Sequence, residues 1–455
     1  MNLAAMLAAR QEQGRPVTVA LIGAGKFGTM FLAQARRTVG LHILGVADLS
    51  PGRARTNLAA CGWTEERIGA RSPGEALDNR TTWVTDDADA LIAHPAVEVV
   101  VEATGDPRAG IRFCLASIAA GKHIVMVNVE ADVVAGPLLA RKARQAGVVY
   151  SLAYGDQPAL ICEQVDWARA CGFEVVAAGK GTRYLPRYHA STPDTVWDNF
   201  GFSREMVARG GMNPKMFNSF IDGTKSGIEM AAVSNATGLL PQDDGLAFPP
   251  CPAPDLAKIC KPRAKGGVLG RAGTVEVVSS LNRDGTSVPN HLQWGVYVVV
   301  AAEHEYVRNC AQEYCMLPDE TFEHMALYRP IHMIGLEIGV SVASAALRRE
   351  PTGAPLAFHA DVAAAAKRPL KAGEVLDGEG GYCVWGKQVP ASRSLDQGYL
   401  PLGLASHVTL KRDIPEGGLL RWADVTYDAN DPAVKFRREM EAAFGRPNEA
   451  AASIQ

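Results

Sequence analysis

The stretch from Val17 to Gly28, VTVALIGAGKFG, constrains the fold of this chain more than any other. A run typical of a buried β-strand enters a turn with three glycines, and an apolar-periodic segment predicts a helix directly after it. In this order the first glycine permits a tight turn, the second lets the backbone approach a pyrophosphate, and the third lets helix and strand pack closely. The stretch therefore predicts a dinucleotide site, with the phosphates on the helix N-terminus. The residues assigned to it are Gly23, Gly25, Lys26, Phe27 and Gly28.

A second strand is predicted over His42–Asp48, and its last residue is an acid. An acid at about this distance from the glycine turn binds the ribose hydroxyls of NAD, so Asp48 alone favours NAD. Arg53 follows closely, and a guanidinium there can hold the 2′-phosphate of NADP. The residues alone leave the choice between the two cofactors open.

Strands and helices continue to alternate as far as Leu152, which predicts a doubly wound parallel α/β sheet of the Rossmann type. One buried strand leads into Thr104 and Gly105, and the next ends at Asn128. The carboxyl ends of parallel strands face the ligand in such sheets, so these three residues are predicted to line the cofactor site. Glu130 is predicted to lie at the mouth of the cleft and to contact substrate.

The chain has 455 residues, more than one ordinary core accommodates, and three domains are predicted. They are a nucleotide-binding domain over 1–152, an α+β catalytic and dimerisation domain with an antiparallel sheet over 153–348, and a small, mostly-β domain over 349–455. The apolar segment 331–347 is predicted to form a buried helix that packs back on the first domain. The strand-like segments that flank 282–290 predict a hairpin with a long loop.

Charge and cysteine usage exclude several classes of protein. The net charge is −3, which provides no basic field for nucleic acid. The nine cysteines form no C-x-x-C pair, which is typical of reduced thiols in a cytoplasmic protein. The N-terminal segment is too short and broken for a secretion signal and is predicted to form a helix, and no segment is expected to cross a membrane.

The densest polar cluster runs from Asp222 through Lys225 to Glu229. On a helix Lys225 and Glu229 share a face, because they are four residues apart. Small and apolar neighbours predict partial burial, in which a lysine and two carboxylates shift each other's pKa toward neutrality, as general acid–base catalysis needs. The alternative is a solvated stripe of ion pairs.

Lys180 lies between two glycines at the end of a predicted strand, which favours close approach by a ligand. Together with Arg183, Lys215 and Lys225 it would supply the positive charge that a phosphorylated or carboxylated substrate requires. We predict that Lys180 joins Asp222, Lys225 and Glu229 as a catalytic residue, and that Arg183 and Lys215 bind substrate.

Oxygen ligands for Mg²⁺ or Mn²⁺ are available in Glu130, Asp156 and Glu229. Their spacing matches no recognisable ligand pattern, so the sequence leaves open whether a metal binds and which residues would hold it.

Two resemblances sharpen this interpretation. The segments GAGKFG and EATG, followed by a strand that ends in Asn, resemble homoserine dehydrogenase. That family has a catalytic lysine after this asparagine and an Asn-Gly-Thr motif, whereas this chain has Val129 after Asn128 and Lys180-Gly181-Thr182. A resemblance over nearly the whole chain is to the DRL family of 1-deoxy-D-xylulose-5-phosphate reductoisomerase-like enzymes. It rests on IGAGKFGTMFLAQARR, YGDQPALI, GKGTRYLP and DGTKSGIEMAAVSNATGL. The C-terminal part is similar to a SAF domain, a β-clip module.

The DRL resemblance implies a three-domain homodimer that uses NADPH, with a divalent cation, Mg²⁺ or Mn²⁺, as a further possible cofactor. It implies reductive rearrangement of 1-deoxy-D-xylulose 5-phosphate to 2-C-methyl-D-erythritol 4-phosphate in isoprenoid biosynthesis. Lys225 or Lys180 would then polarise or protonate the substrate oxygen, and Glu229 or Asp222 would remove the hydroxyl proton. Two alternatives stay open. One is an NAD(P)-dependent dehydrogenase for another small aldehyde or polyol, and the other is a sensor protein that works through its SAF-like tail.

Overall fold

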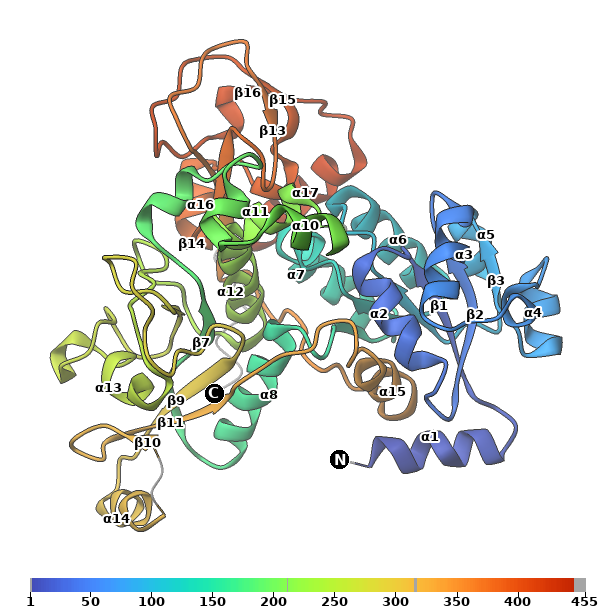
Figure 1. Ribbon diagram of the computed structural model, residues 1–455, viewed down its shortest axis with the longest axis horizontal. Helices are drawn as coiled ribbons and strands as arrows, with labels where there is room; N and C mark the ends of the chain where they lie inside the picture. Colours follow the sequence, from blue (N-terminus) through green and yellow to red (C-terminus); the bar gives the residue numbers. More distant parts are fainter. Residues whose placement is uncertain (1, 211, 315–316, 446–455) are drawn as a thin grey trace. The chain divides into compact units, whose positions relative to one another are not determined.

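The computed structural model describes residues 2–210, 212–314 and 317–445 (Figure 1). The chain divides into two compact units: residues 1–160 with 332–356, and residues 161–331 with 357–455. The division into three domains, with boundaries after residues 152 and 348, stays a prediction. Helix α8 (Gln157–Ala170) spans the boundary between the units.

Six parallel strands form the sheet of unit 1, in the order β3-β2-β1-β4-β5-β6. The order reverses between β1 and β4, which is where doubly wound sheets bind their ligands. The predicted Rossmann sheet is therefore confirmed. The strands are β1 (Val17–Ile22), β2 (Leu41–Ala47), β3 (Trp83–Thr85), β4 (Val99–Glu102), β5 (His123–Met126) and β6 (Tyr150–Leu152).

Both faces of this sheet are covered, as β1 shows by its alternation. Val19 and Leu21 pack in one apolar cluster with Phe31, whereas Ala20 and Ile22 pack in another cluster on the opposite side. A strand buried on both faces has a continuous apolar sequence, which explains the run before the glycine turn. The helices of this unit are α1 (Leu3–Glu12), α2 (Lys26–Ala35), α3 (Pro51–Ala60), α4 (Pro73–Asn79), α5 (Ala88–Ala93), α6 (Pro107–Ala119), α7 (Val129–Gln145) and α15 (Gly339–Arg348).

The helix predicted over 331–347 is wrong in its first half, because α15 begins only at Gly339. Gly335 has a φ of +83°, in the left-handed region, and this conformation interrupts any helix through it. The helical part packs against α1, β4 and β5 within unit 1. The polar segment before residue 86 contains α4 and the short edge strand β3.

Unit 2 is built around a mixed five-stranded sheet in the order β10-β11-β9-β7-β8. Strand β7 pairs in parallel with β8 and antiparallel with β9, so the sheet is not purely antiparallel as predicted. The predicted hairpin is wrong because β7 lies between its two strands. The connection over 280–295 is long enough to cross the width of that central strand. The strands are β7 (Glu174–Thr182), β8 (Thr274–Ser279), β9 (Val296–Ala301), β10 (Leu317–Pro318) and β11 (His324–Arg329).

Helix α12 (Thr224–Thr237) is the most enclosed element of unit 2. All of its residues except Lys225 are buried, and it packs against β8, β12 and β14. The predicted cluster from Asp222 to Glu229 is therefore no solvated stripe. The other helices of the unit are α9 (Val196–Phe200), α10 (Arg204–Gly210), α11 (Pro214–Ile221), α13 (Leu256–Ile259) and α14 (Glu305–Glu313).

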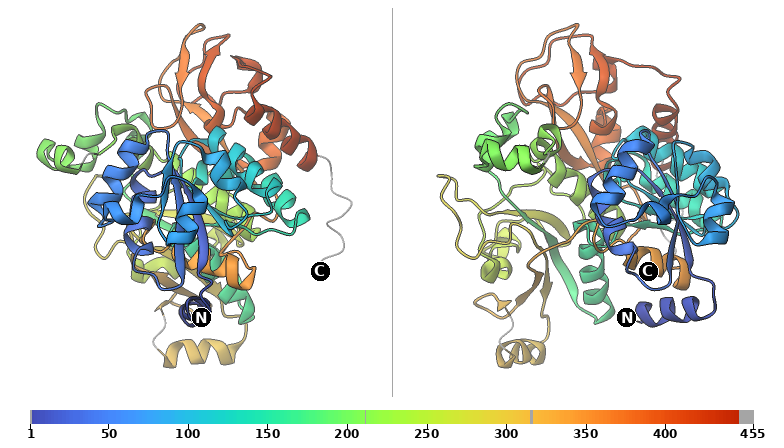
Figure 2. Two further views of the ribbon diagram at one scale, coloured as in Figure 1. Left: turned by 90° about the vertical axis from the view of Figure 1, so that its right-hand side faces the viewer. Right: turned by 45° about the vertical axis from the view of Figure 1, so that its right-hand side comes forward.

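The C-terminal elements, orange to red in Figure 2, gather at one end of unit 2 and are mostly β, as predicted. Strands β12 (Ala360–Ala366) and β14 (Val384–Pro390) form an antiparallel pair. Strands β13 (Val375–Asp377), β15 (Ser406–Leu410) and β16 (Val425–Thr426) form a second sheet. Helices α16 (Ala391–Gln397) and α17 (Pro432–Phe444) complete the segment, and residues 446–455 lie outside the described residues.

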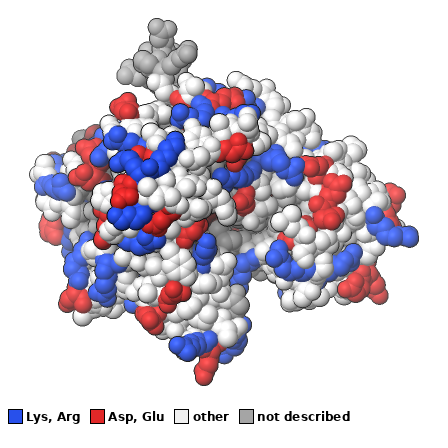
Figure 3. Space-filling view, turned by 90° about the horizontal axis from the view of Figure 1, so that it is seen from above, with Lys and Arg blue, Asp and Glu red and all other residues white. Residues whose placement is uncertain are grey.

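Positive and negative side chains are interspersed over the face seen in Figure 3. Among the described residues, no helix combines the length and the apolar character needed to cross a membrane.

Candidate functional site

The glycine turn of unit 1 has the geometry that a dinucleotide requires. Gly23 adopts a φ of +94°, and a Cβ on Gly28 would lie 2.2 Å from the Gly23 carbonyl oxygen. At Gly25 a Cβ would meet no atom within 4 Å, so the space beside this residue is open. Helix α2 begins after Gly25 without a side-chain cap, and Lys26 and Phe27 form its first turn. The uncapped N–H groups and the open space fit a pyrophosphate.

Asp48, just after β2, is already held by protein groups. Its carboxylate accepts hydrogen bonds from the Ala24 N–H and the Ser50 N–H, both at 2.9 Å, and pairs with Arg53 at 2.8 Å. Burial alone would raise the pKa of Asp48, but these hydrogen bonds and the guanidinium hold it below its usual value. The Arg53 side chain is 62% exposed, whereas Arg55 is bound to the Ile68 carbonyl.

The predicted strand-end residues come together. The Asn128 amide donates to the Thr104 hydroxyl oxygen at 3.3 Å and to the Asp106 carbonyl at 2.9 Å, and its own oxygen caps α7. Gly105 lies between Thr104 and Asp106 in the sequence and has a φ of +74°. Thr104 and Asn128 are therefore joined in one network at the ends of β4 and β5, and Gly105 is the residue next to Thr104. Glu130 lies in the first turn of α7 and is half-buried.

Glu102 belongs to the same network and was missed by the sequence analysis. It is fully buried at the end of β4, and its carboxylate accepts from the Thr104 N–H at 3.0 Å. Burial raises its pKa to about 7, against the opposing effect of the hydrogen bonds from Thr104 and Asn128. The only signal was an acid at the end of an otherwise apolar strand, inside the EATG segment.

Unit 2 joins the predicted catalytic residues in an unexpected pairing. The buried Lys180 ammonium, on β7, pairs with the buried Glu229 carboxylate on α12. Asp222 is also fully buried, but its ion-pair partner is Lys367, at 2.7 Å. The second oxygen of Asp222 accepts from the Thr224 N–H at 2.9 Å and so fixes the first turn of α12. Lys225 lies in that turn and is half-buried.

Lys367, directly after β12, was not predicted. Its ammonium also donates to the Ser191 carbonyl at 2.6 Å and to the Gly381 carbonyl at 2.8 Å, and the residue is only 5% exposed. The single signal for Lys367 in the sequence was a lysine directly after an apolar run, which covers residues 362–366. Its three partners come from distant segments, so no local pattern identifies them.

His189 is a second unpredicted residue of this cluster. Its Nδ1 lies 2.7 Å from the Asp222 carbonyl oxygen and its Nε2 lies 2.9 Å from the Tyr184 hydroxyl. A carbonyl only accepts, so Nδ1 carries the proton and the Tyr184 hydroxyl donates to Nε2. Burial lowers the pKa of His189, which favours this neutral form, and the ring stacks on Trp385 with 3.7 Å between centroids. Tyr184 in turn stacks on Phe248.

The two predicted substrate-binding cations contact backbone carbonyls. The Arg183 guanidinium donates to the Asn199 carbonyl at 3.0 Å, and the exposed Lys215 donates to the Asp377 carbonyl at 3.4 Å.

Within the described parts of the chain, His, Cys, Asp and Glu side chains nowhere gather in a group of three or more that could hold a metal ion. Glu229, one of the acids considered as a ligand, is paired with Lys180. The described residues therefore offer no preformed carboxylate cluster for Mg²⁺ or Mn²⁺.

Comparison with known proteins gives two domain matches. Residues 23–152 match the model of the NAD-binding domain of homoserine dehydrogenase, and residues 155–338 match the model of the catalytic domain of oxidoreductase DRL. The first match begins at the glycine turn. The second includes Lys180, Asp222, Lys225 and Glu229, whereas Lys367 lies beyond it.

Individual relatives are distant. A segment of 83 residues is 34% identical to homoserine dehydrogenase of Pseudomonas aeruginosa and spans 18% of this chain but only 19% of that protein. The solved homoserine dehydrogenase of Thiobacillus denitrificans is 19% identical, with 50% of each chain covered and a TM-score of 0.35. An NAD-binding oxidoreductase of Klebsiella pneumoniae is 21% identical over 39% of this chain and 45% of that chain, with a TM-score of 0.28. The two domain matches, taken with the glycine turn, give this chain the domain composition of an NAD(P)-dependent oxidoreductase of the DRL and homoserine dehydrogenase-like type.

Proposed function

We propose that this protein is an NADPH-dependent oxidoreductase that converts 1-deoxy-D-xylulose 5-phosphate into 2-C-methyl-D-erythritol 4-phosphate, in isoprenoid biosynthesis. The observation that carries the proposal is the buried Lys180–Glu229 ion pair, because it lies in the segment that matches the DRL catalytic domain. A SAF-like C-terminal domain and a homodimer belong to the same proposal, as the DRL resemblance implies them.

The ion pair provides both proton transfers that the reaction needs. Glu229 accepts the proton of the substrate hydroxyl, and carbon migration then produces an aldehyde. NADPH, when bound, supplies the hydride that reduces this aldehyde. The Lys180 ammonium donates a proton to the oxygen on which negative charge develops, so that the product is an alcohol. Lys225, half-buried in the first turn of α12, is the alternative donor.

Asp222 is proposed to position the base and not to act as one. Its charge is balanced by Lys367, and its other oxygen holds the first turn of the helix that carries Glu229. Lys367 belongs to the C-terminal segment and also donates to the carbonyls of Ser191 and Gly381. These contacts hold the C-terminal segment beside Asp222.

NADPH is proposed over NADH because of Asp48 and Arg53. The Asp48 oxygens are taken by two backbone N–H groups and by Arg53, which leaves them less available to ribose hydroxyls. The exposed Arg53 guanidinium is suited to a 2′-phosphate.

The deciding experiment is turnover of NADPH with 1-deoxy-D-xylulose 5-phosphate, followed by absorbance, with the product identified by carbon NMR. The rearranged branched polyol phosphate is the expected product. Oxidation of NADPH with an unbranched product, or no oxidation with this substrate, would contradict the proposed reaction.

A second candidate is a homoserine dehydrogenase-like reduction of another small aldehyde or oxidation of a polyol. It is favoured by the match of residues 23–152 to the homoserine dehydrogenase NAD-binding domain. A panel of small hydroxyaldehydes and polyols, assayed with NADPH, NADP⁺, NADH and NAD⁺, tests it directly. Turnover there without turnover of the deoxyxylulose phosphate would favour this candidate.

A further inference from the structure

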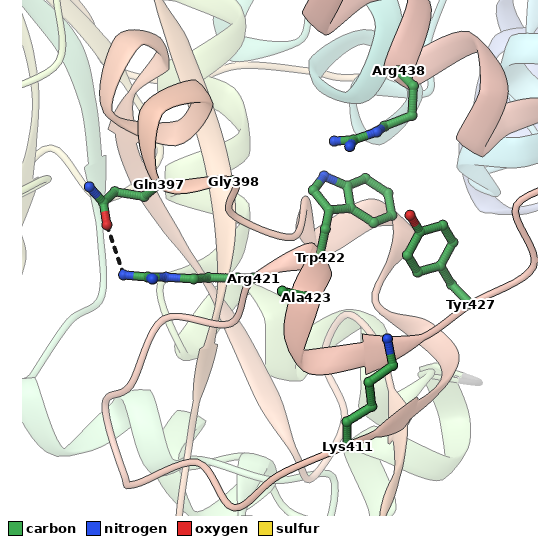
Figure 4. A pocket seen from close by; sticks show the side chains of 8 residues that line it. All are labelled: Gln397, Gly398, Lys411, Arg421, Trp422, Ala423, Tyr427 and Arg438. Atoms are coloured by element: carbon green, nitrogen blue, oxygen red, sulfur yellow. Dashed lines mark hydrogen bonds between the residues drawn. The ribbon is translucent and has the colours of Figure 1, made fainter.

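A cavity of about 470 Å³ lies among the C-terminal elements of unit 2 (Figure 4). The cations of its lining point away from one another. Arg421 extends toward Gln397, to which it donates at 2.7 Å, whereas Lys411 and Arg438 lie on opposite sides of two aromatic rings. Arg438 also pairs with Glu441 at 2.5 Å. These charges therefore do not converge on a ligand.

Glu102, in unit 1, is a buried acid that the proposed reaction does not use. It is the last residue of β4 and is fully buried. The N–H and the hydroxyl of Thr104 both donate to Glu102 Oε1, at 3.0 and 2.5 Å. The Thr104 hydroxyl oxygen accepts in turn from the Asn128 amide at 3.3 Å. Hydrogen bonds therefore connect this carboxyl group to the edge of the sheet that is expected to hold the cofactor.

The nicotinamide half of a bound cofactor is expected at the end of β4. Asp48 and Arg53 follow β2 and are assigned to the adenosine half, on one side of the point where the strand order reverses. A dinucleotide crosses that point, so its other half belongs to the ends of β4 and β5. Space is available there, because a Cβ on Gly105 would meet no atom within 4 Å. The Glu102 network therefore borders the place expected for the nicotinamide ring.

The charge of Glu102 is not balanced by an ion pair. Within the described parts of the chain, no lysine or arginine pairs with its carboxyl group, which has hydrogen-bond donors only. Burial raises its pKa to about 7, so its charge changes near neutral pH. The ionisable side chains beside it or on elements packed against β4 are Arg108, Arg112 and Cys114 on α6, His123 on β5, Glu130 and Asp132 in the first turn of α7, Tyr150 on β6 and the exposed Arg348 on α15, whereas β1 has none.

We propose that Glu102 acts through Thr104 and Asn128 as a positioning residue of the nicotinamide site, and that its negative charge favours the oxidised cofactor over the reduced one. The nicotinamide ring is positively charged in NADP⁺ and neutral in NADPH, so only the oxidised ring is attracted by a nearby carboxylate. By linkage, NADP⁺ then favours loss of the Glu102 proton, and NADPH does not. This inference rests on the cofactor of the proposed function and is independent of its substrate.

The test is titration of the full-length protein with NADP⁺ and with NADPH at pH 5.5 and at pH 8.5. Both ligands carry the same 2′-phosphate, so its own ionisation cancels in the ratio of the two dissociation constants. The preference for NADP⁺ over NADPH is expected to rise by about threefold to tenfold between these pH values, as Glu102 ionises. A ratio that is the same at both pH values would overturn the inference alone. Failure of both ligands to bind would overturn it together with the proposed cofactor.

Glu102→Gln keeps an acceptor for the Thr104 N–H but carries no charge. Its ratio of dissociation constants should not change with pH and should stay near that of the parent at pH 5.5. The matched control is Asp132→Asn, because Asp132 is equally buried but accepts from Tyr150 and not from the strand-end network. The control should keep the pH dependence of the parent. Loss of that dependence in both variants, or its retention in Glu102→Gln, would exclude Glu102 as the responsible group.

A second measurement needs no substitution and therefore does not depend on the folding of a variant. Calorimetric titration of the parent at pH 7, in buffers of different ionisation enthalpy, gives the number of protons released on binding. NADP⁺ is expected to release more protons than NADPH, by a fraction of a proton per site. Equal proton release by the two ligands would contradict the coupling between Glu102 and the charge of the ring.

Discussion

Glu229 and Lys180 form an ion pair in which both side chains are almost completely enclosed. Their side chains are 4% and 7% exposed, and they come from different elements, α12 and β7. Removing one partner of a buried pair costs about 3–5 kcal/mol, because it leaves an uncompensated charge. A substitution at this pair is therefore expected to change both the stability of the fold and the catalytic rate, so an experiment must measure both.

Glu229→Gln keeps the shape of the side chain but removes the proposed base. We expect kcat to fall by about 100-fold or more, while the KM for NADPH changes little, since the cofactor residues lie in unit 1. The measurement is steady-state kinetics together with a thermal melt. The control is Glu416→Gln, which changes an exposed acid. A variant that stays folded and retains near-parent kcat would exclude Glu229 as the base.

Arg53 and Arg55 offer a matched pair for cofactor choice. Arg53 pairs with Asp48 and is exposed, whereas Arg55 is bound to the Ile68 carbonyl. Arg53→Gln should raise the KM for NADPH by roughly tenfold and leave that for NADH almost unchanged, because a charged contact to phosphate is worth about 1.5–3 kcal/mol. Arg55→Gln should leave both values near those of the parent. Equal loss of NADH and NADPH in the Arg53 variant would contradict a 2′-phosphate contact.

At the scale of elements, the turn between β1 and α2 contains two glycines, Gly25 and Gly28, that are expected to have different roles. A Cβ at Gly28 would collide with the Gly23 carbonyl, whereas one at Gly25 would enter open space. Gly28→Ala should thus lower the Tm of the cofactor-free protein by several degrees and weaken NADPH binding. Gly25→Ala should leave that Tm unchanged and still weaken NADPH binding by about tenfold or more, because the methyl group occupies the space assigned to the pyrophosphate.

The measurements are thermal melts with and without NADPH. Gly270→Ala is the control, since a Cβ there would meet only the Gln242 Oε1 atom, at 3.7 Å, and the residue lies in unit 2. Undiminished NADPH binding by Gly25→Ala would show that no phosphate lies beside Gly25.

Helix α12 shows how elements far apart in sequence hold the candidate site. Thr224, in its first turn, accepts from the Gly386 N–H at 2.8 Å, and Asn235, near its end, accepts from the N–H groups of His359 and Ala360. The C-terminal segment therefore forms hydrogen bonds with both ends of the helix that carries Glu229. The matched DRL segment ends before these strands begin, so the site of this chain includes residues outside it.

At the scale of the whole molecule, buried carboxyl groups in unit 1 link stability to pH. Burial raises the pKa of both Glu102 and Asp132 to about 7, although each accepts hydrogen bonds, Asp132 from Tyr150. A folded-state pKa above the unfolded value means that the folded protein binds more protons. The stability these groups contribute is therefore present below about pH 4 and is lost as the pH rises to about 7.

Asp132→Asn tests this linkage, because asparagine stays neutral and still accepts from Tyr150. The parent should lose several degrees of Tm between pH 5 and pH 8, and the variant should lose measurably less, since a few kcal/mol of carboxyl ionisation are removed. Calorimetry at matched ionic strength gives the curves, with Asp78→Asn as an exposed control. Parallel curves for the parent and Asp132→Asn would contradict the raised pKa.

The sequence by itself determined the parallel sheet, the glycine turn and the gathering of Thr104, Gly105 and Asn128 at its edge. These follow from local signals, since an apolar run, a glycine spacing and a helix pattern each act within about a dozen residues, and parallel topology brings strand ends together. Glu102 was not predicted as part of this network, because its burial depends on the neighbouring strands and not on its own segment.

Only the tertiary structure decided the partners of the catalytic candidates. Helical spacing placed Lys225 beside Glu229, yet the partner found is Lys180, 49 residues away, and Asp222 pairs with Lys367 of the C-terminal segment. In the same way, β7 lies between β8 and β9, the two strands that the sequence pattern predicted to form a hairpin. Burial makes each charge require a close counter-charge, but any lysine brought near by the packing satisfies that requirement, and no local pattern says which one it is.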